Sequence, residues 1–138
     1  MGISALSRQE MKISCEDDVV LIRRHARSVA QQQAFDAFAA AAITTATSEL
    51  TRNVLVHAGG GSAVIEVVTD GVRNGVRLTF HDDGPGIPDV ERVMRGGYST
   101  ARSLGLGLSG SKRLVDEFEL ESEVGKGTTV TFVKWKPY

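Results

Sequence analysis

Glu49 and Asn53 lie four residues apart in the stretch SELTRNVLVHAGG, which otherwise has the apolar spacing of a helix packed into a core. Around a helix the two side chains are separated by about 40°, beside an apolar stripe that includes Leu50 and Val54. A carboxylate next to an amide suits Mg²⁺-nucleotide chemistry, because an amide oxygen is a hard neutral ligand and a carboxylate can accept a hydroxyl proton. The alternative is an ordinary pair of surface residues in i,i+4 proximity.

A second candidate is Asp82, near the end of the segment GVRLTFHDDGPG. Strand alternation places Asp82 on the same face as Val76 and Phe80. A carboxylate on an apolar face requires hydrogen-bond donors, and the exocyclic amine of adenine would be one. Gly84 and Gly86 would let a flat ligand approach the backbone closely. The alternative is that the strand has ended and Asp82 begins a turn, which the composition of DDGPG also favours.

The third candidate is the glycine-rich stretch SLGLGLSGSKRL. It contains G-x-G-x-x-G at Gly105, Gly107 and Gly110, but no strand precedes it, which argues against a dinucleotide-binding fold. The order Gly-Ser-Lys at 110–112 reverses the end of a P-loop. What remains is a glycine-rich loop before a helix N-terminus, where free N–H groups and the helix dipole attract phosphate. A flexible linker followed by a packed helix is compatible with the same pattern.

Composition limits the class of protein. With 138 residues and 41% hydrophobic residues, the chain can bury one core, so we expect a single domain over 1–138, with 1–10 disordered or loosely attached. A net charge of −1 leaves no excess of Lys and Arg for nucleic acid. Cys15 is the only cysteine, which excludes an intrachain disulfide. No apolar run approaches the roughly 20 residues that cross a bilayer, so we expect a soluble, cytoplasmic protein without membrane contact.

Periodicity and turn residues predict the elements that would position these candidates. The expected helices are one capped by Asp17 or Asp18, one from about 38–42 to the glycines at 59–61, a short one at 90–95 and, after a loop at 96–104, one at about 107–117. The expected strands are 11–15, 62–70, 75–83, 118–124 and 128–135, with positive φ angles at the Gly and Asn of the turn GVRNG. This grouping indicates an α/β (α+β) two-layer sandwich, with a mixed, mostly antiparallel sheet and helices on one face.

Taken together, the motifs resemble a known family. Four of them are similar, in order and approximate spacing, to the N, G1, G2 and terminal glycine-threonine boxes of the GHKL (Bergerat-fold) ATPases: Glu49-x-x-x-Asn53, Asp82-x-Gly84-x-Gly86, Gly105-Leu106-Gly107-Leu108 and Gly127-Thr128. The resemblance covers roughly 11–136 and is greatest to the small anti-sigma-factor-type serine/threonine kinases, including the stressosome switch kinases. The interval of 18 residues between Gly86 and Gly105 is short, unlike the long lids of the chaperone and topoisomerase branches.

The resemblance implies a role for each motif residue. Glu49 would be the general base, and Asn53 would ligate Mg²⁺. Asp82 would accept a hydrogen bond from the adenine amine, with Thr128 beside it. Gly84 and Gly86 would leave room for the adenine base. The residues implied to hold the phosphates are Gly105, Leu106, Gly107 and Leu108, with Arg102 and Lys112 as additional charge partners.

The resemblance also implies an activity. It is that of an ATP- and Mg²⁺-dependent serine/threonine protein kinase, which phosphorylates a STAS-domain antagonist protein in a bacterial partner-switching stress response. On release, the kinase would activate a PP2C-type phosphatase. The main alternative is a nucleotide-gated partner-binding module with little or no catalysis. A detached histidine-kinase catalytic domain is disfavoured, because no phosphoacceptor helix pair fits in front of residue 40.

Three further residues near these motifs allow two interpretations. His57 is four residues after Asn53 and could approach a site there, although a helix-end histidine favoured by the helix dipole is the simpler interpretation. Asp83 would add a second negative charge near the base site. Trp135 is interpreted as an end-strand packing residue, with an anchor for a partner as the alternative.

Overall fold

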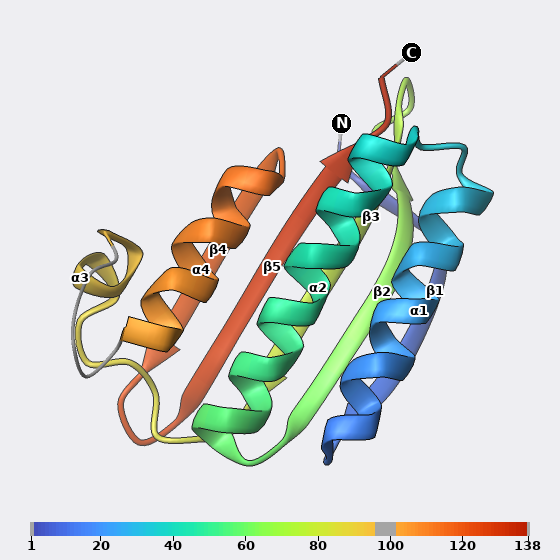
Figure 1. Ribbon diagram of the computed structural model, residues 1–138. Helices are drawn as coiled ribbons and strands as arrows, with labels where there is room; N and C mark the ends of the chain where they lie inside the picture. The colour runs from blue at the N-terminus through green and yellow to red at the C-terminus, as the bar shows by residue number, and fades with distance from the viewer. Residues whose placement is uncertain (1, 96–101, 138) are drawn as a thin grey trace.

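The computed structural model describes residues 2–95 and 102–137; for 102–106 it describes the backbone alone (Figure 1). Nine elements follow one another along the chain: β1 (Ser4–Ile13), α1 (Glu16–Gln32), α2 (Ala37–Ala58), β2 (Gly61–Thr69), β3 (Asn74–Asp82), α3 (Val90–Arg95), α4 (Arg102–Leu114), β4 (Glu117–Glu123) and β5 (Gly127–Trp135). The strands form one sheet in the order β1-β2-β3-β5-β4. All four pairings are antiparallel, and the helices lie on one face of the sheet. The predicted two-layer sandwich is therefore confirmed.

The core lies between the sheet and the helices α1, α2 and α4. Phe80 of β3 and Phe132 of β5 stack with ring centroids 6.2 Å apart, and both belong to the same core cluster as the buried Leu50 of α2. The buried residues of α1 are Val19, Ile22, Ala26 and Ala30. Burial of each large apolar side chain of this core contributes about 1.5–3 kcal/mol to folding, so the core holds the helices against the strands.

Helix α2 carries two of the candidate residues and has well-defined ends. Asp36 caps its N-terminus by accepting a hydrogen bond from the Ala39 N–H at 2.8 Å. Gly59 ends it in the left-handed conformation, with φ of 77°. The predicted end at the glycines is confirmed, and the helix begins at Ala37, slightly earlier than expected. Because both ends are fixed, Glu49 and Asn53 occupy defined positions along the helix.

The N-terminal segment corrects the expectation that 1–10 is loosely attached. Ser4–Ile13 forms β1, which pairs with β2 from Ser4 opposite Thr69 to Ile13 opposite Gly61. The predicted strand at 11–15 is only the end of this longer strand. Its side chains are exposed up to Glu10, so no apolar alternation marks the strand, and backbone pairing with β2 provides its attachment.

The cap of α1 also differs from the expectation. Cys15 is the N-cap residue, and Asp18 reaches back to it from the first turn. The Asp18 carboxylate accepts hydrogen bonds from the backbone N–H groups of Ser14 at 2.7 Å and Cys15 at 3.1 Å. The Ser14 N–H bond is the largest influence that lowers the pKa of Asp18 below its ordinary value of 3.8.

Two loop expectations are wrong in detail. In the turn GVRNG only Gly71 has a positive φ, at 94°; Asn74 and Gly75 begin β3 in extended conformation. The turn is instead held by Asp70, whose carboxylate accepts hydrogen bonds from the N–H groups of Val72 and Arg73. Helix α4 begins at Arg102 rather than near 107, so the motif glycines lie inside the helix and not in a loop before it.

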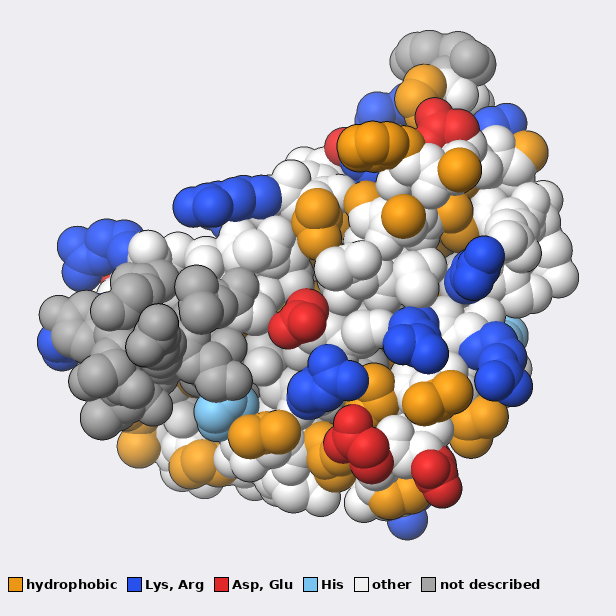
Figure 2. Space-filling model, viewed as in Figure 1, with side chains coloured by type: hydrophobic (Ala, Val, Ile, Leu, Met, Phe, Trp, Pro, Cys, Tyr) orange, Lys and Arg blue, Asp and Glu red, His pale blue; other side chains and the backbone are white. Residues whose placement is uncertain are grey.

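The helix-covered side of the molecule has an ordinary mixed surface. Figure 2 shows hydrophobic side chains dispersed among Lys, Arg, Asp and Glu on this side. Isolated exposed apolar side chains are usual on a protein surface and need no special role. Within the described residues, no helix combines the length and apolar character that a membrane span requires.

Candidate nucleotide-binding site

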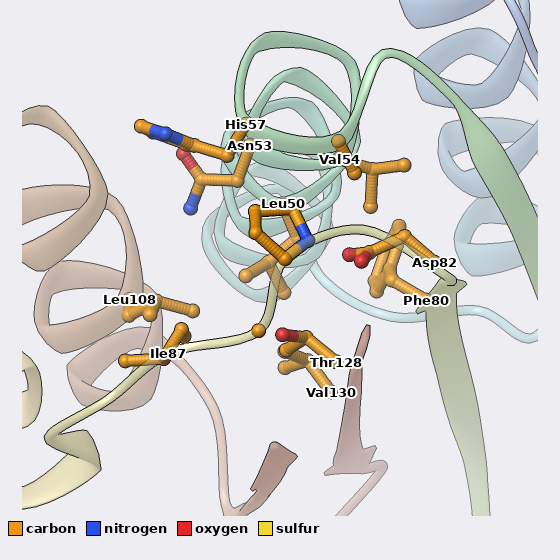
Figure 3. A pocket seen from close by; sticks show the side chains of 13 residues that line it. Leu50, Asn53, Val54, His57, Phe80, Asp82, Ile87, Leu108, Thr128 and Val130 are labelled. Carbon is orange, nitrogen blue, oxygen red and sulfur yellow. The ribbon is translucent and has the colours of Figure 1, made fainter. Parts of the chain in front are cut away.

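A cavity lies between the C-terminal half of α2, helix α4 and the ends of β3 and β5 (Figure 3). We call the part formed by the strand ends and the loop after β3 the sheet-side wall, and the part formed by α2 and α4 the helix-side wall. The residues that line the cavity are Leu50, Asn53, Val54, His57, Ala58, Phe80, Asp82, Pro85, Gly86, Ile87, Leu108, Thr128 and Val130. Most are apolar, and a few polar groups point inward, which is typical of a small-molecule site.

Asp82 ends β3 on the sheet-side wall. As alternation predicts, it follows the buried Val76, Leu78 and Phe80 on the core-facing side, and its side chain is directed into the cavity with only 8% of the residue exposed. Its Oδ1 accepts a hydrogen bond from the Gly84 N–H at 2.9 Å. In the described part of the chain, Oδ2 accepts none. Asp82 therefore fits both interpretations, the turn residue and the ligand-binding carboxylate, since one oxygen caps the turn while the other remains available to a ligand.

Thr128 stands next to Asp82 on the sheet-side wall. The two residues are opposite each other in the pairing of β3 with β5. Both side chains carry their oxygen atoms toward the cavity in Figure 3. The predicted proximity of these two residues is thus present, and together they place a carboxylate and a hydroxyl on one wall.

Ser122 of β4 does not line the cavity in the described residues, but it supports the sheet-side wall, and the sequence reasoning missed it. It is opposite Thr128 in the pairing of β4 with β5, and the two hydroxyl oxygens are 2.8 Å apart. Its Oγ also accepts a hydrogen bond from the Ile87 N–H at 2.8 Å. The signal was available: Ser122 continues the inward-facing positions of Phe118 and Leu120 in FELESE, just as Asp82 continues an apolar face in β3.

The glycines of the sheet-side wall have a packing role besides the expected one, which stays a prediction. A Cβ at Gly84 would lie 2.6 Å from the Ala58 Cβ, and one at Gly86 would lie 2.3 Å from the Glu123 carbonyl oxygen. Gly84 is not among the described residues that line the cavity, whereas Gly86 is. Both therefore permit close packing of the loop after β3 on its neighbours, rather than simply leaving space for a ligand.

The same loop is fastened to the hairpin between β4 and β5. The Gly125 N–H donates to the Pro85 carbonyl at 2.9 Å. Gly127 has a φ of 121°, and a Cβ there would lie 2.0 Å from the Asp82 carbonyl oxygen. This contact admits glycine only, so Gly127 lets the β4–β5 hairpin pack directly against the end of β3.

Asn53 occupies the helix-side wall. Its Nδ2 is buried and has no hydrogen-bond partner among the described residues. Gly107 of α4 lies against this amide, since a Cβ there would be 2.8 Å from Nδ2. His57, one turn further along α2, also lines the cavity, so it is both a helix-end histidine and a site residue.

The unpartnered amide fits an oxygen-ligated cation. A buried polar group without a partner is uncommon in proteins, and a ligand that completes it is a usual explanation. The oxygen and nitrogen of an amide exchange places by rotation of the group, so Asn53 can turn its oxygen into the cavity. No cluster of three or more His, Cys, Asp or Glu able to hold a metal occurs in the described residues. Mg²⁺ needs none, because it binds through one or two protein ligands together with phosphate and water.

The remaining candidates lie elsewhere. Glu49 is half-buried on α2, one turn before Asn53, and is absent from the described cavity lining. Lys112 is exposed on α4 and does not line the cavity either, whereas Leu108 is buried and does. The predicted side-chain roles of Arg102 and Leu106, and that of Gly105, lie outside the described residues.

Two surrounding residues settle the alternatives stated above. Asp83 is absent from the described cavity lining, and 88% of its side chain is exposed, with its carboxylate 3.1 Å from Nε2 of His81. Its carboxylate therefore does not contact the cavity. Trp135 is buried, donates through Nε1 to the carboxylate of Glu117 and stacks beneath the guanidinium of Arg73, which is the predicted packing role.

Comparison with known proteins identifies the family. Residues 39–137 match the family of histidine kinase-, DNA gyrase B- and HSP90-like ATPases, and the chain belongs to this family. It is 46% identical over 125 residues to the serine/threonine-protein kinase RsbT of Bacillus subtilis, an alignment that covers 91% of this chain and 94% of that protein. It is 36% identical over 100 residues to the anti-sigma F factor of Geobacillus stearothermophilus, covering 67% of this chain and 66% of that one.

A solved structure agrees on the fold. The crystal structure of the RsbU and RsbW domains of Rv1364c from Mycobacterium tuberculosis superimposes with a TM-score of 0.63, covering 94% of this chain and 33% of that one at 20% identity. The predicted membership of the GHKL ATPases is confirmed, as is the class of enzyme, an ATP-dependent serine/threonine protein kinase similar to the anti-sigma-factor type.

Proposed function

We propose that the protein is a partner-switching kinase that transfers the γ-phosphoryl group of ATP to a hydroxyl of a STAS-domain antagonist protein. The observation that carries the proposal is the cavity itself, where the buried carboxylate of Asp82 faces inward from one wall and Asn53, whose Nδ2 has no partner among the described residues, lines the other. The 46% identity to the serine/threonine-protein kinase RsbT supports transfer to a hydroxyl of a protein. We retain the interpretation of 1–138 as a single cytoplasmic domain, which is supported by its one sheet and by ATP as the phosphoryl donor.

In this proposal the sheet-side wall binds the base. Asp82 accepts a hydrogen bond from the adenine amine through its available oxygen, with Thr128 next to it. The apolar lining residues, among them Ile87, Leu108 and Val130, cover the rest of the base and exclude water. A hydrogen bond between a charged acceptor and a neutral donor contributes about 1.5–3 kcal/mol, which is enough to orient the nucleotide.

The helix-side wall holds the phosphate end. Asn53 supplies an amide oxygen to Mg²⁺, and the cation, when bound, neutralises charge on the phosphate groups. Gly107 lets α4 approach Asn53 closely. The phosphate contacts implied for Gly105, Leu106, Arg102 and Lys112 stay predictions. Because α4 begins at Arg102, only the N–H groups of its first turn are free of internal hydrogen bonds and available to a phosphate.

Glu49 is the proposed general base. It lies one turn from Asn53 on the same helix, so a hydroxyl of the partner brought next to the phosphate end can reach its carboxylate. General base assistance of this kind contributes a factor of about 10²–10⁴ in rate. After transfer, the released kinase binds and activates a PP2C-type phosphatase.

One observation favours a second candidate function. Glu49 does not line the cavity in the described part of the chain, and a nucleotide-gated binding module requires Asn53 and Asp82 but no base. Exchange of Glu49 for Gln separates the two functions, with ATP affinity and phosphoryl transfer both measured. For a kinase, affinity is kept while transfer falls by about 10²-fold or more. Unchanged transfer would remove Glu49 from the mechanism.

The decisive experiment for the function uses the purified chain, Mg-ATP and a candidate STAS-domain partner. The intact mass of the partner is measured before and after incubation. We expect a gain of one phosphoryl group that requires Mg²⁺ and is lost in the Asp82→Ala variant. A partner that binds the chain only when ATP is present, without any gain in mass, would favour the binding module.

A further inference from the structure

Ser122 joins three segments at the base of the sheet-side wall. Its hydroxyl oxygen is 2.8 Å from the Ile87 backbone nitrogen, 2.8 Å from the Thr128 hydroxyl oxygen and 3.1 Å from the Gly127 carbonyl oxygen. The first contact belongs to the loop after β3, and the other two belong to β5. Ser122 itself does not line the cavity in the described residues, so it acts on a ligand only through its neighbours.

One assignment of protons satisfies all three contacts. A serine hydroxyl has one hydrogen to donate and two lone pairs to accept with. The Ile87 N–H can only donate to Ser122, and the Gly127 carbonyl can only accept from it. The single Ser122 hydroxyl proton is therefore donated to the Gly127 carbonyl oxygen, so Thr128 must donate its own hydroxyl proton to Ser122. Thr128 consequently presents only lone pairs toward the cavity.

The opposite assignment leaves a contact unmade. If Ser122 donated to Thr128, the Gly127 carbonyl would lose its hydrogen bond from Ser122, and the Thr128 proton would be free to point into the cavity. The full network thus makes Thr128 an acceptor. Asp82 is opposite Thr128 across the β3–β5 pairing and is an acceptor as well. Two acceptors stand next to each other on the wall.

We propose that Ser122 is a positioning residue that sets the base selectivity of the cavity, by keeping Thr128 an acceptor next to Asp82. This inference rests on the proposed function, since it takes the nucleotide to be bound in this cavity. A base with an amine at the edge that meets the wall supplies hydrogens to two acceptors, directly or through one water. A base with a carbonyl there places a third acceptor against them, so that contact has no hydrogen to share, which is the effective way for a site to reject a ligand.

A purely structural role for Ser122 makes a different prediction. The Ile87 contact, together with the hydrogen bond from Gly125 to Pro85, fastens the loop after β3 to the β4–β5 hairpin. Loosening that loop weakens the binding of every nucleotide to the same extent. Only a change in the ratio of affinities for two bases, and not a change in the affinity for one base, therefore shows that Ser122 positions the Thr128 hydroxyl.

The test measures binding of Mg-ATP and Mg-ITP to the full chain by calorimetry, because inosine has a carbonyl where adenosine has the amine. We expect wild type to prefer ATP and Ser122→Ala to reduce the ATP:ITP affinity ratio at least about fivefold, as the freed Thr128 proton can then serve the carbonyl. Ser122→Thr keeps the hydroxyl and should keep the ratio. Should Ser122→Ala fail to fold, Ser122→Cys, a weak hydrogen-bonding group, carries the same expectation of a reduced ratio.

Thr128→Val provides the matched control. Without the Thr128 hydroxyl, adding Ser122→Ala should change the ratio no further, because Ser122 acts through that hydroxyl. An unchanged ratio in Ser122→Ala, with intact ATP preference in wild type, would refute this inference alone. If wild type binds neither nucleotide, the proposed function fails and the inference fails with it.

Discussion

The two walls of the cavity are built on different principles. On the sheet-side wall nearly every polar group has a partner: Asp82 accepts from the Gly84 N–H, and Ser122 connects Ile87 to Thr128. On the helix-side wall the buried Nδ2 of Asn53 has no partner in the described part of the chain. The sheet-side wall is thus held together before a ligand arrives, with one oxygen of Asp82 left for the ligand, whereas the buried amide nitrogen on the helix-side wall has no partner among the described residues. Changes on the first wall should cost stability, selectivity or affinity for the base, and changes on the second should cost only ligand binding.

The largest effect is expected from Gly127→Ala. Its φ of 121° and the distance of 2.0 Å from an added Cβ to the Asp82 carbonyl oxygen leave no room for a side chain. We expect the free energy of unfolding, measured by urea denaturation, to fall by about 3 kcal/mol or more. Gly110→Ala in α4 is the control, since an added Cβ there meets nothing within 4 Å. It should be neutral or stabilise by up to about 1 kcal/mol. Equal stabilities of the two variants would mean that the close contact of Gly127 with the Asp82 carbonyl does not contribute to stability.

The next effect concerns Asp82→Asn. The amide has the size of the carboxylate but lacks its charge and presents hydrogens to the ligand, so the affinity for ATP measured by calorimetry should fall about 10- to 100-fold. Asp83→Asn is the matched control, because that carboxylate is 88% exposed and absent from the described cavity lining. It should leave the affinity unchanged. Similar losses in both variants would show that the net charge of the loop matters rather than the contact.

Asn53→Ala should separate binding from stability. The buried Nδ2 of Asn53 has no hydrogen bond to lose among the described residues, so we expect the free energy of unfolding to change by less than about 1 kcal/mol. The gain in ATP affinity that Mg²⁺ gives to wild type, relative to EDTA, should disappear. Asn74→Ala, exposed at the start of β3, should keep the Mg²⁺ effect. A large loss of stability in Asn53→Ala, or a retained Mg²⁺ effect, would remove the distinction between the walls.

The smallest effect lies outside both walls, at the cap of α1. The pKa of Asp18 is lowered by the hydrogen bond from the Ser14 N–H, so the folded state favours its charged form. A carboxylate with a lowered pKa contributes stability above its ordinary pKa of 3.8, and this contribution is lost as pH falls through the lower folded pKa. Asp18→Asn should therefore be less stable than wild type at pH 7, and the difference should close below pH 3.8. A difference that stays constant down to pH 3 in urea denaturation would contradict this pKa direction.

Residues whose role follows from local pattern were predictable. Alternation alone placed Asp82 on the core face of its strand, and helical spacing placed Asn53 beside a buried stripe, because side-chain direction repeats regularly along each element. The strand β1 was not predictable in this way. It lies at the sheet edge, its side chains are exposed up to Glu10, and it depends on backbone pairing that any sequence can make.

The start of α4 was missed for a related reason. Glycines lower helix propensity, so a loop was the better expectation for the segment that contains Gly105 and Gly107. The structure places both in the helix, and Gly107 lies directly against the Asn53 amide. Close packing of two helices decided the outcome against local preference.

By itself, the sequence determined which chemical groups the protein has and which face of its own element each one occupies, since both depend on neighbours within a few positions. Only the tertiary structure decided that the buried Nδ2 of Asn53 has no partner among the described residues and that Ser122 meets Ile87 and Thr128 at one point. Those contacts require strand registers and helix packing between segments far apart along the chain, and no local pattern encodes such distances.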